Sequence, residues 1–184
     1  MKTIILEGSA RRRGRTAELV EFLRLRLPGE VTVVRAYDTP VSPCRDCRYC
    51  LSHPGCAVKD EMQDLYPAIE GCDNLIIASP LYFHSVPAPL KTIIDRLQPY
   101  WAATVRGDED QISTKRGALL LVGGAPPFEG QFLPAELMLR GVLSDLHASC
   151  EDIIRMDDAD RRPLPQRPEI QAQLTALAQR LSTL

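Results

Sequence analysis

The chain begins with a short apolar segment that leads into a polar loop: residues 3–16 read TIILEGSARRRGRT. The apolar and β-branched run at 3–6 predicts a strand that ends where the loop starts, near Gly8. Beyond Thr16, apolar residues recur at helical spacing as far as Pro28, which predicts a helix over this stretch. A strand, a loop and a helix in this order are the first unit of a parallel α/β sheet.

The same alternation continues to the end of the chain. Near-continuous apolar runs at 74–79 and 118–122 predict strands that are buried on both faces. Two further strands, the second weaker, are expected at 31–36 and 150–156. Four further helices are expected at 59–70, with Asp60 as the candidate cap, and at 90–97, 134–147 and 170–184. Five strands alternating with helices predict a three-layer α/β/α sandwich whose strands are parallel.

Length and composition narrow the class of protein further. The 184 residues carry a formal net charge of −2 and are 45% hydrophobic, which is an ordinary globular composition. A nucleic-acid binder is usually basic, and no apolar run approaches the roughly 18 residues that span a bilayer. The N-terminal apolar run is too short for a secretory signal. We therefore expect one cytoplasmic domain over residues 1–184, with no nucleic-acid or membrane partner and an irregular cysteine-rich insertion at about 38–58.

The loop from Gly8 to Thr16 has the features of a phosphate cradle. Backbone amides at the start of a helix favour an anion, hydroxyls of Ser9 and Thr16 can donate to it, and arginines can pair with phosphate oxygens. Five residues separate Gly8 from Gly14 and an arginine follows, so the loop is not a Walker motif, and the dinucleotide fingerprint is also absent. The pattern indicates a mononucleotide site, with a solvated basic loop as the alternative.

A second loop, after the strand at 74–79, reads PLYFHSVP over residues 80–87. Its prolines stiffen it, its backbone amides are expected to be free of the sheet ladder, and its aromatic side chains suit a flat heteroaromatic ring. Gly123 and Gly124 follow the next strand and allow close approach of the backbone. Ordinary core packing of Tyr82 and Phe83 is the alternative, and His84 is either a proton donor or a surface residue.

The cysteine spacing is the most specific feature: Cys44, Cys47, Cys50 and Cys56 follow one another as C-x2-C-x2-C-x5-C. Four thiolates this close in sequence can surround one inorganic core, either a [4Fe–4S] cluster or a zinc ion, the latter held by all four or by three of them and His53. The compact triple spacing favours iron–sulfur, because zinc sites more often use two separated pairs. Cys72 and Cys150 are expected to be structural thiols.

Taken together, these motifs resemble a known family. Residues 8–16 resemble the flavin phosphate loop of the NADPH-dependent FMN reductase group of the flavodoxin-like superfamily, although the family usually has Asn where Arg15 stands. Residues 79–96 resemble its flavin-ring loop and following helix, and the cysteine run with VKDEM at 58–62 resembles the iron–sulfur flavoprotein branch. The resemblance implies a five-stranded sheet of order 2-1-3-4-5, bound FMN, a [4Fe–4S] cluster, and a homodimer or homotetramer in which a cluster lies near a neighbouring subunit's flavin.

The resemblance also implies which residues contact each cofactor. The FMN phosphate would be held by Ser9, Arg11, Arg13, Arg15 and Thr16. The ring would be contacted by Pro80, Leu81, Tyr82, Phe83, His84, Gly123 and Gly124. The cluster ligands would be Cys44, Cys47, Cys50 and Cys56. No protein acid, base or nucleophile is assigned a catalytic role, because the cofactors supply the redox chemistry.

The expected function is therefore that of an FMN-dependent oxidoreductase that passes electrons between a reduced donor, FMN and a [4Fe–4S] cluster, with NAD(P)H or ferredoxin as the donor. Three alternatives remain open at this point. They are an NAD(P)H-dependent FMN or quinone reductase without a cluster, an electron carrier similar to flavodoxin, and a zinc-stabilised binding module without flavin.

Overall fold

A computed structural model describes residues 1–183 and contains a five-stranded, all-parallel sheet of order β2-β1-β3-β4-β5. The strands are β1 (Lys2–Glu7), β2 (Glu30–Arg35), β3 (Asn74–Pro80), β4 (Lys115–Val122) and β5 (Ala148–Met156). The helices are α1 (Arg15–Arg24), α2 (Met62–Glu70), α3 (Ala88–Asp95), α4 (Gln98–Arg106), α5 (Leu133–Asp145) and α6 (Pro168–Ser182), with short 3-10 turns η1 (Tyr49–Leu51), η2 (Glu109–Gln111) and η3 (Leu164–Gln166). The expected fold class and strand order are confirmed.

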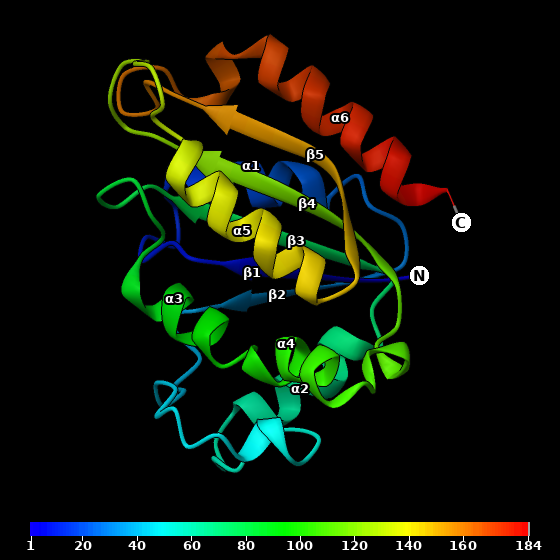
Figure 1. Ribbon diagram of the computed structural model, residues 1–184. Coiled ribbons are helices and arrows are strands. Elements are labelled where there is room, and N and C mark those ends of the chain that lie inside the picture. The colour runs from blue at the N-terminus through cyan, green and yellow to red at the C-terminus, as the bar shows by residue number, and fades with distance from the viewer. Residues whose placement is uncertain (184) are drawn as a thin grey trace.

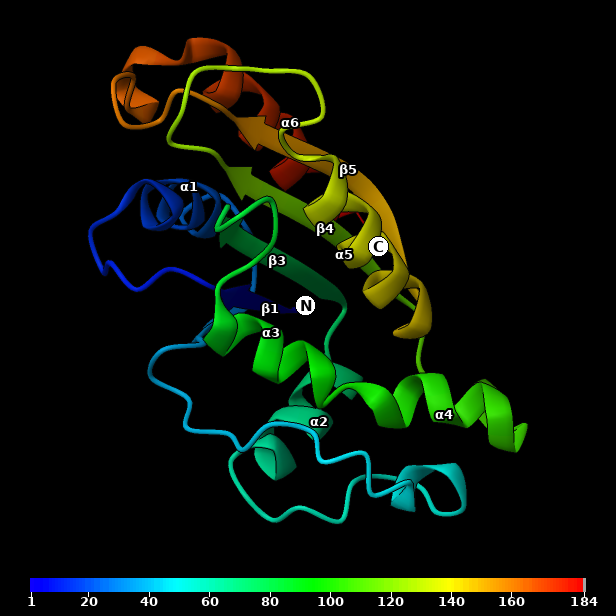
Figure 2. The ribbon, with the colours of Figure 1, turned by 60° about the vertical axis from the view of Figure 1, so that its left-hand side comes forward.

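Two separate apolar cores lie on the two faces of the sheet, because successive strand residues point in opposite directions. Ile5, Ile76 and Leu120 pack with α1 and α6 on one face. On the other face, Leu6 and Ile77 pack with α2, α3, α4 and α5. Figures 1 and 2 show the resulting three layers, with the sheet between the two groups of helices.

The region after α3 differs from the sequence-based expectation. The helix expected at 90–97 ends at Asp95, and a separate helix, α4, follows it directly. Pro99 stands at the second position of α4, where its missing N–H costs no intrahelical hydrogen bond. Helix α4 contacts η1, so it supports the cysteine-rich segment, which runs below α2 and α4 in both ribbon views.

The carboxyl ends of all five strands lie at one edge of the sheet, on the left in Figure 1, and the two chain ends lie toward the opposite edge. The final helix ends at Ser182, and Leu184, which we expected on its apolar face, lies outside the described residues. Over residues 1–183, none of the helices combines the length and the apolar character that a membrane crossing requires.

Candidate functional site

The loop between β1 and α1 is held in place from both sides. The Gly8 amide donates to the Ala78 carbonyl at 2.8 Å, and a Cβ at Gly8 would lie 2.7 Å from Leu90 Cδ2, so a larger residue would displace the Leu90 side chain. The Ser9 hydroxyl lies 3.2 Å from the Arg11 amide, which donates to it. Gly14 precedes α1, and no side chain in the described part of the protein caps the first turn of that helix. The amides of this turn are therefore available to an anion from outside the chain.

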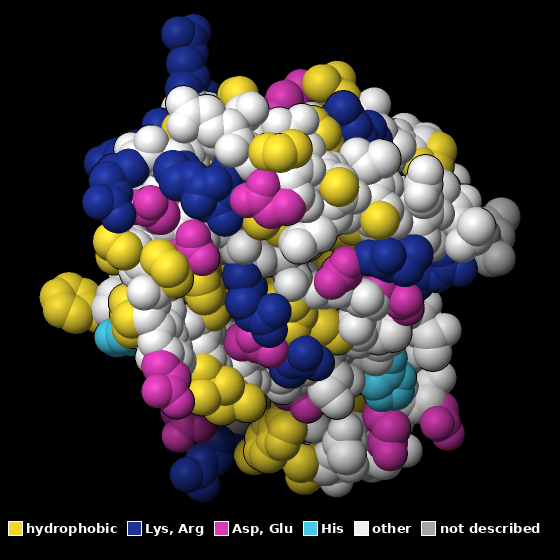
Figure 3. Space-filling model, turned by 90° about the horizontal axis from the view of Figure 1, so that it is seen from above, with side chains coloured by type: hydrophobic (Ala, Val, Ile, Leu, Met, Phe, Trp, Pro, Cys, Tyr) yellow, Lys and Arg dark blue, Asp and Glu magenta, His cyan; other side chains and the backbone are white. Residues whose placement is uncertain are grey.

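A pocket of about 210 Å³ lies at the carboxyl edge of the sheet, beside this helix start. It is lined from the first loop, from the ends of β3 and β4, and from the loop after β5. The lining residues are Ser9, Arg11, Gly14, Arg15, Thr16, Pro80, Leu81, Tyr82, Val122, Gly124, Ala159 and Asp160. We call this the edge pocket. Seen from the side of α6, Lys and Arg side chains gather toward this end of the sheet, with acidic side chains among them (Figure 3).

Four residues that the sequence placed in the site do not line the edge pocket. Arg13 lines a groove on the outer side of α1, and Gly123 is covered by Gln131. Phe83 and His84 project from the loop after β3, with Phe83 fully exposed and His84 packed edge-on against Phe128, ring centroids 5.7 Å apart.

The backbone amides of the loop after β3 were expected to be free, and for part of the loop this expectation is wrong. The Leu81 amide donates to the Val122 carbonyl at 2.8 Å, and the Tyr82 and Ser85 backbones exchange hydrogen bonds, so these groups are already paired. Phe83 and His84 stand between them with φ of 49° and 62°, the backbone of a type I′ turn. Because glycine and asparagine usually occupy such positions, the sequence offered no signal for this turn.

The chain after β5 also contributes to the site, and none of its residues was expected there from the sequence. The Ala159 amide donates to the Gly123 carbonyl at 3.0 Å, and Arg15 Nε donates to the Ala159 carbonyl at 2.8 Å. The side chain of Arg15 is also paired with Glu18 at 2.7 Å, so these two contacts hold it in place at the wall of the pocket. The position of the segment directly after the fifth strand was the available signal, because all strand ends meet at this edge.

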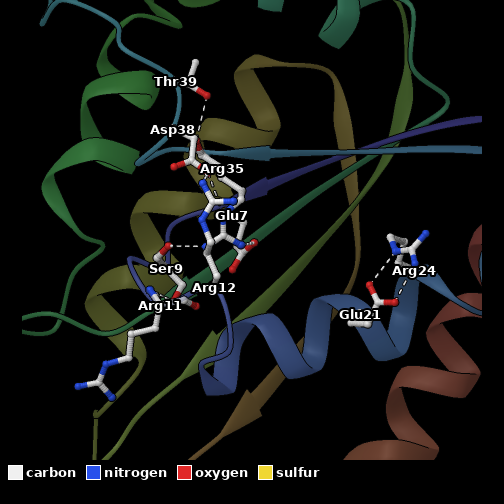
Figure 4. Close-up of polar contacts among 9 residues, drawn as sticks. All are labelled: Glu7, Ser9, Arg11, Arg12, Glu21, Arg24, Arg35, Asp38 and Thr39. Atoms are coloured by element: carbon white, nitrogen blue, oxygen red, sulfur yellow. Dashed lines mark hydrogen bonds and ion pairs between the residues drawn. The ribbon is translucent and has the colours of Figure 1, made fainter.

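A buried ion pair lies beneath the first loop. Glu7 at the end of β1 is paired with Arg35 at 2.8 Å, and its side chain is only 2% exposed. Burial raises the pKa of Glu7, and the neighbouring Arg35 offsets this only partly. Asp38 pairs with Arg35 and, at 2.8 Å, with Arg12 of the loop, as Figure 4 shows, whereas Arg11 extends away from this group. This network joins the loop to the residues that lead into the cysteine-rich segment.

The four cysteines of that segment surround a second cavity, of about 60 Å³, which we call the cysteine cavity. Cys44 and Cys47 are exposed, and Cys50 and Cys56 are half-buried. Burial and the neighbouring thiols raise the pKa of Cys50. Within residues 1–183 all the cysteines are free thiols, and no three Cys, His, Asp or Glu side chains are gathered closely enough for a single metal ion.

Side chains from the neighbouring helices hold this irregular segment. Arg106 of α4 donates to the Cys50 carbonyl and is itself paired with Asp108 at 2.8 Å. Asp60, the expected helix cap, accepts the Met62 amide at 3.2 Å and is paired with the buried Arg96 at 2.7 Å. Hydrogen bonds from Arg96 lower the pKa of Asp60 to about 2.

Strand order and pocket position together define the class of protein. A doubly wound parallel sheet of order 2-1-3-4-5 with a pocket at the ends of β1 and β3 is a flavodoxin-like α/β protein. The sequence model of NADPH-dependent FMN reductases matches residues 1–149, and the chain belongs to this family.

Curated relatives agree with this assignment. An iron–sulfur flavoprotein of Archaeoglobus fulgidus is 32% identical over 121 residues, covering 65% of this chain and 60% of its own length. An iron–sulfur flavoprotein of Methanosarcina thermophila is 30% identical over 133 residues, covering 68% of this chain and 64% of its own length. The chain thus spans less than two thirds of either relative.

Solved structures share the fold over the whole chain. A Streptococcus mutans protein superposes with a TM-score of 0.72 at 17% identity, covering 98% of this chain and 100% of that one. An FMN-dependent NADH-azoreductase from Bacillus anthracis, solved with FMN, superposes with a TM-score of 0.66 at 13% identity over 100% of both chains. At these identities the likeness establishes the fold alone.

Proposed function

We propose that the protein is an FMN-dependent oxidoreductase that binds FMN in the edge pocket and a [4Fe–4S] cluster in the cysteine cavity, and that passes electrons between a reduced donor and these two groups. The observation that carries the proposal is the convergence of four separate loops on one pocket at the switch point between β1 and β3, which is where flavodoxin-like proteins take FMN. When bound, FMN would accept electrons in pairs and release them singly, and the cluster would exchange one at a time.

The chain's own residues supply a binding site for the phosphate end of the ligand. The uncapped first turn of α1 offers backbone amides, and the buried Thr16 adds a hydroxyl donor. The Ser9 hydroxyl donates to the Arg11 carbonyl at 3.2 Å and would turn toward the phosphate when it binds. Arg11 and Arg15 add positive charge at the same pocket. We place the phosphate here and leave Arg13 out of the cradle, because its side chain lines the outer groove of α1.

The opposite side of the pocket suits the uncharged parts of the ligand. Pro80, Leu81 and Tyr82 offer apolar contact for one face of a flat ring, and Gly124 leaves room for close approach. The Asp160 carboxylate would repel a phosphate, but it can accept hydrogen bonds from the ribityl hydroxyls. This division orients the ligand with its phosphate at α1 and its hydroxyls toward the loop after β5.

The thiol arrangement supports a cluster over zinc. Zinc sites with four cysteines more often use two separated pairs, whereas here two gaps of two residues and one gap of five join all four cysteines in one run. Four thiolates around a cavity instead suit the larger core of a [4Fe–4S] cluster, for which Cys44, Cys47, Cys50 and Cys56 would be the ligands.

Electron transfer between the two sites is proposed to involve a second copy of the chain. The edge pocket and the cysteine cavity share no lining residue. Exposed apolar side chains, Phe83, Phe128, Leu133 and Leu137, lie on the loop after β3, on the loop before α5 and on α5 itself. These features support a homodimer or homotetramer that brings one protomer's cysteine segment near another's flavin, with NAD(P)H or ferredoxin as donor.

The test is anaerobic purification followed by a visible spectrum and by flavin, iron, sulfide and zinc assays on one sample. We expect one FMN per chain and about four iron and four sulfide per chain, as a [4Fe–4S] cluster requires. A flavin spectrum without iron and sulfide would leave a simpler FMN reductase. A colourless protein that takes up no FMN would overturn the proposal altogether.

A further inference from the structure

Arg96, the residue directly after α3, ties together the two ends of the cysteine-rich segment. Its Nη1 donates to the Ser42 carbonyl at 2.8 Å, and its Nη2 donates to the Val58 carbonyl at 3.3 Å. Ser42 stands two residues before Cys44, and Val58 stands two residues after Cys56. One guanidinium therefore closes the whole loop that carries the four thiols.

The same guanidinium is also bonded to the carboxylate of Asp60. Both terminal nitrogens donate to Asp60, at 2.7 and 3.1 Å, and Asp60 also accepts the Ser42 amide at 2.8 Å. Arg96 is only 1% exposed, and Tyr66 donates its hydroxyl to the Arg96 carbonyl at 2.6 Å. This set of contacts fixes the plane of the guanidinium without any bound group.

One donor of this buried cation has no partner. Arg96 Nε is buried and makes no hydrogen bond with any of the described residues, and Arg96 lines the cysteine cavity. A buried N–H without an acceptor is unfavourable unless something supplies one. Arginine keeps its proton in proteins, and Arg96 is paired with Asp60 at 2.7 Å, so its guanidinium is a cation in the lining of the cysteine cavity.

We propose that Arg96 is the positioning residue of the cysteine cavity: it closes the loop before any cluster is bound, and its unpartnered Nε–H and its charge then act on the sulfur atoms there. The second part rests on the proposed cluster binding. Adding one electron makes a cluster more negative, and a buried cation beside its sulfurs stabilises that state. Arg96 therefore raises the reduction potential of the bound cluster.

The first part is tested on the metal-free full-length chain by limited digestion with chymotrypsin, which can cut at Tyr49 in the segment. We expect Arg96→Gln and Arg96→Lys to be cut several-fold faster than the wild type, because the open form becomes more populated. The matched control is Arg24→Gln, which removes the same charge from an exposed ion pair on α1, away from the segment and from the cut site. Equal cutting of wild type and both Arg96 variants would overturn the clamp.

The second part is tested by a redox titration of the cluster-loaded protein with dithionite, following one-electron reduction. We expect Arg96→Gln to weaken reduction about tenfold, which corresponds to about 59 mV toward negative potential. Arg96→Lys, which keeps the charge, should restore most of the shift. Arg24→Gln, on a helix that packs on the opposite face of the sheet, should match the wild type. An unchanged potential in Arg96→Gln would overturn the electrostatic role.

Two further measurements distinguish a failure of the roles proposed for Arg96 from a failure of the proposed cluster binding. Because Arg96→Gln leaves Asp60 buried without a cation, the double variant Arg96→Gln/Asp60→Asn removes the unpaired charge as well. A shift in the same direction but smaller than that of Arg96→Gln is expected from it, because the negative charge of Asp60 no longer adds to the loss of the cation. Wild-type protein that binds neither iron nor sulfide would overturn the proposed cluster, whereas the digestion of the metal-free chain would still test the clamp.

Discussion

The two cavities of this protein are built in different ways. The edge pocket lies where regular strands end, so the backbone ladders of the sheet hold its loops in place. The cysteine cavity lies in an irregular segment outside the sheet, and side chains such as Arg96 and Arg106 hold it. The first cavity is a consequence of the fold, whereas the second depends on a few individual contacts.

A buried carboxylate–arginine pair lies close to each cavity. The pKa of the carboxyl group is shifted in opposite directions in the two pairs. Glu7 pairs with Arg35, but its second oxygen is buried and has no partner among residues 1–183, and burial dominates, so its pKa is raised. Asp60 accepts bonds from Arg96 and from two backbone amides, and these outweigh burial, so its pKa is lowered to about 2. Near neutral pH the Asp60 pair is therefore stabilising, because its carboxylate has a full set of hydrogen bonds. The Glu7 carboxylate has an incomplete set, so its ionisation does not stabilise the fold.

The largest expected effect comes from removing one thiol, which should abolish binding at the cysteine cavity and leave binding at the edge pocket unchanged. Cys47→Ala should abolish iron and sulfide binding, because the cluster needs four thiolates, while FMN remains bound in the edge pocket. Iron, sulfide and flavin assays on the purified variant measure this. Cys150→Ala, which removes a thiol from β5, is the matched control and should keep its iron. Unchanged iron in Cys47→Ala would contradict the ligand assignment.

A second change addresses the edge pocket alone. Thr16→Val keeps the shape of the side chain but removes its hydroxyl, and a hydrogen bond to a charged phosphate contributes about 1.5–3 kcal/mol. We expect FMN to bind about ten- to a hundredfold more weakly, as measured by fluorescence titration. Thr104→Val, at an exposed position of α4, should bind FMN like the wild type. Equal affinity in Thr16→Val would remove Thr16 from the phosphate site.

A third change tests the ion pair behind the cysteine cavity. Asp60 has a folded pKa of about 2 against an ordinary value of 3.8, so its ionisation contributes about 2 kcal/mol of stability at neutral pH. Asp60→Asn should lose at least this much, and its deficit should shrink as the pH falls from about 4 toward 2. Urea unfolding at several pH values measures it, with the exposed Asp64→Asn as control. A deficit that does not depend on pH would show that the charge pair is not its source.

The smallest expected effect is on the stability of a Glu7 variant, and its pH dependence is opposite to that of Asp60→Asn. The raised pKa of Glu7 means that its contribution to stability is complete below the ordinary value of 4.5 and is lost as the pH rises through the folded pKa. The stability of Glu7→Gln relative to wild type should therefore improve over that range, as measured by urea unfolding. Glu21→Gln, from the exposed pair with Arg24 in Figure 4, is the control and should change little. A relative stability that falls with rising pH would show that Arg35 outweighs burial.

Much of the edge pocket could be predicted from the sequence. Buried strands at 74–79 and 118–122 and the helix after Thr16 fixed which loops meet at one edge, and Ser9, Arg11, Thr16, Leu81 and Gly124 do line the pocket there. Phe83 and His84 lie outside this lining, because residue type does not report a turn with positive φ at both positions. Their contact with the ring stays a prediction.

By itself the sequence determined the alternation of strands and helices, the glycine-bounded loop and the spacing of four cysteines, because each depends on residues close together in the chain. The tertiary structure alone decided that Ala159 meets Arg15 across 144 positions and that Arg96 meets Ser42 across 54. Periodicity tells which face of an element is buried, but not which distant carbonyl a buried guanidinium will reach. That depends on how the helices settle on the sheet, where burial of a charge is tolerated only when partners from remote segments supply its hydrogen bonds.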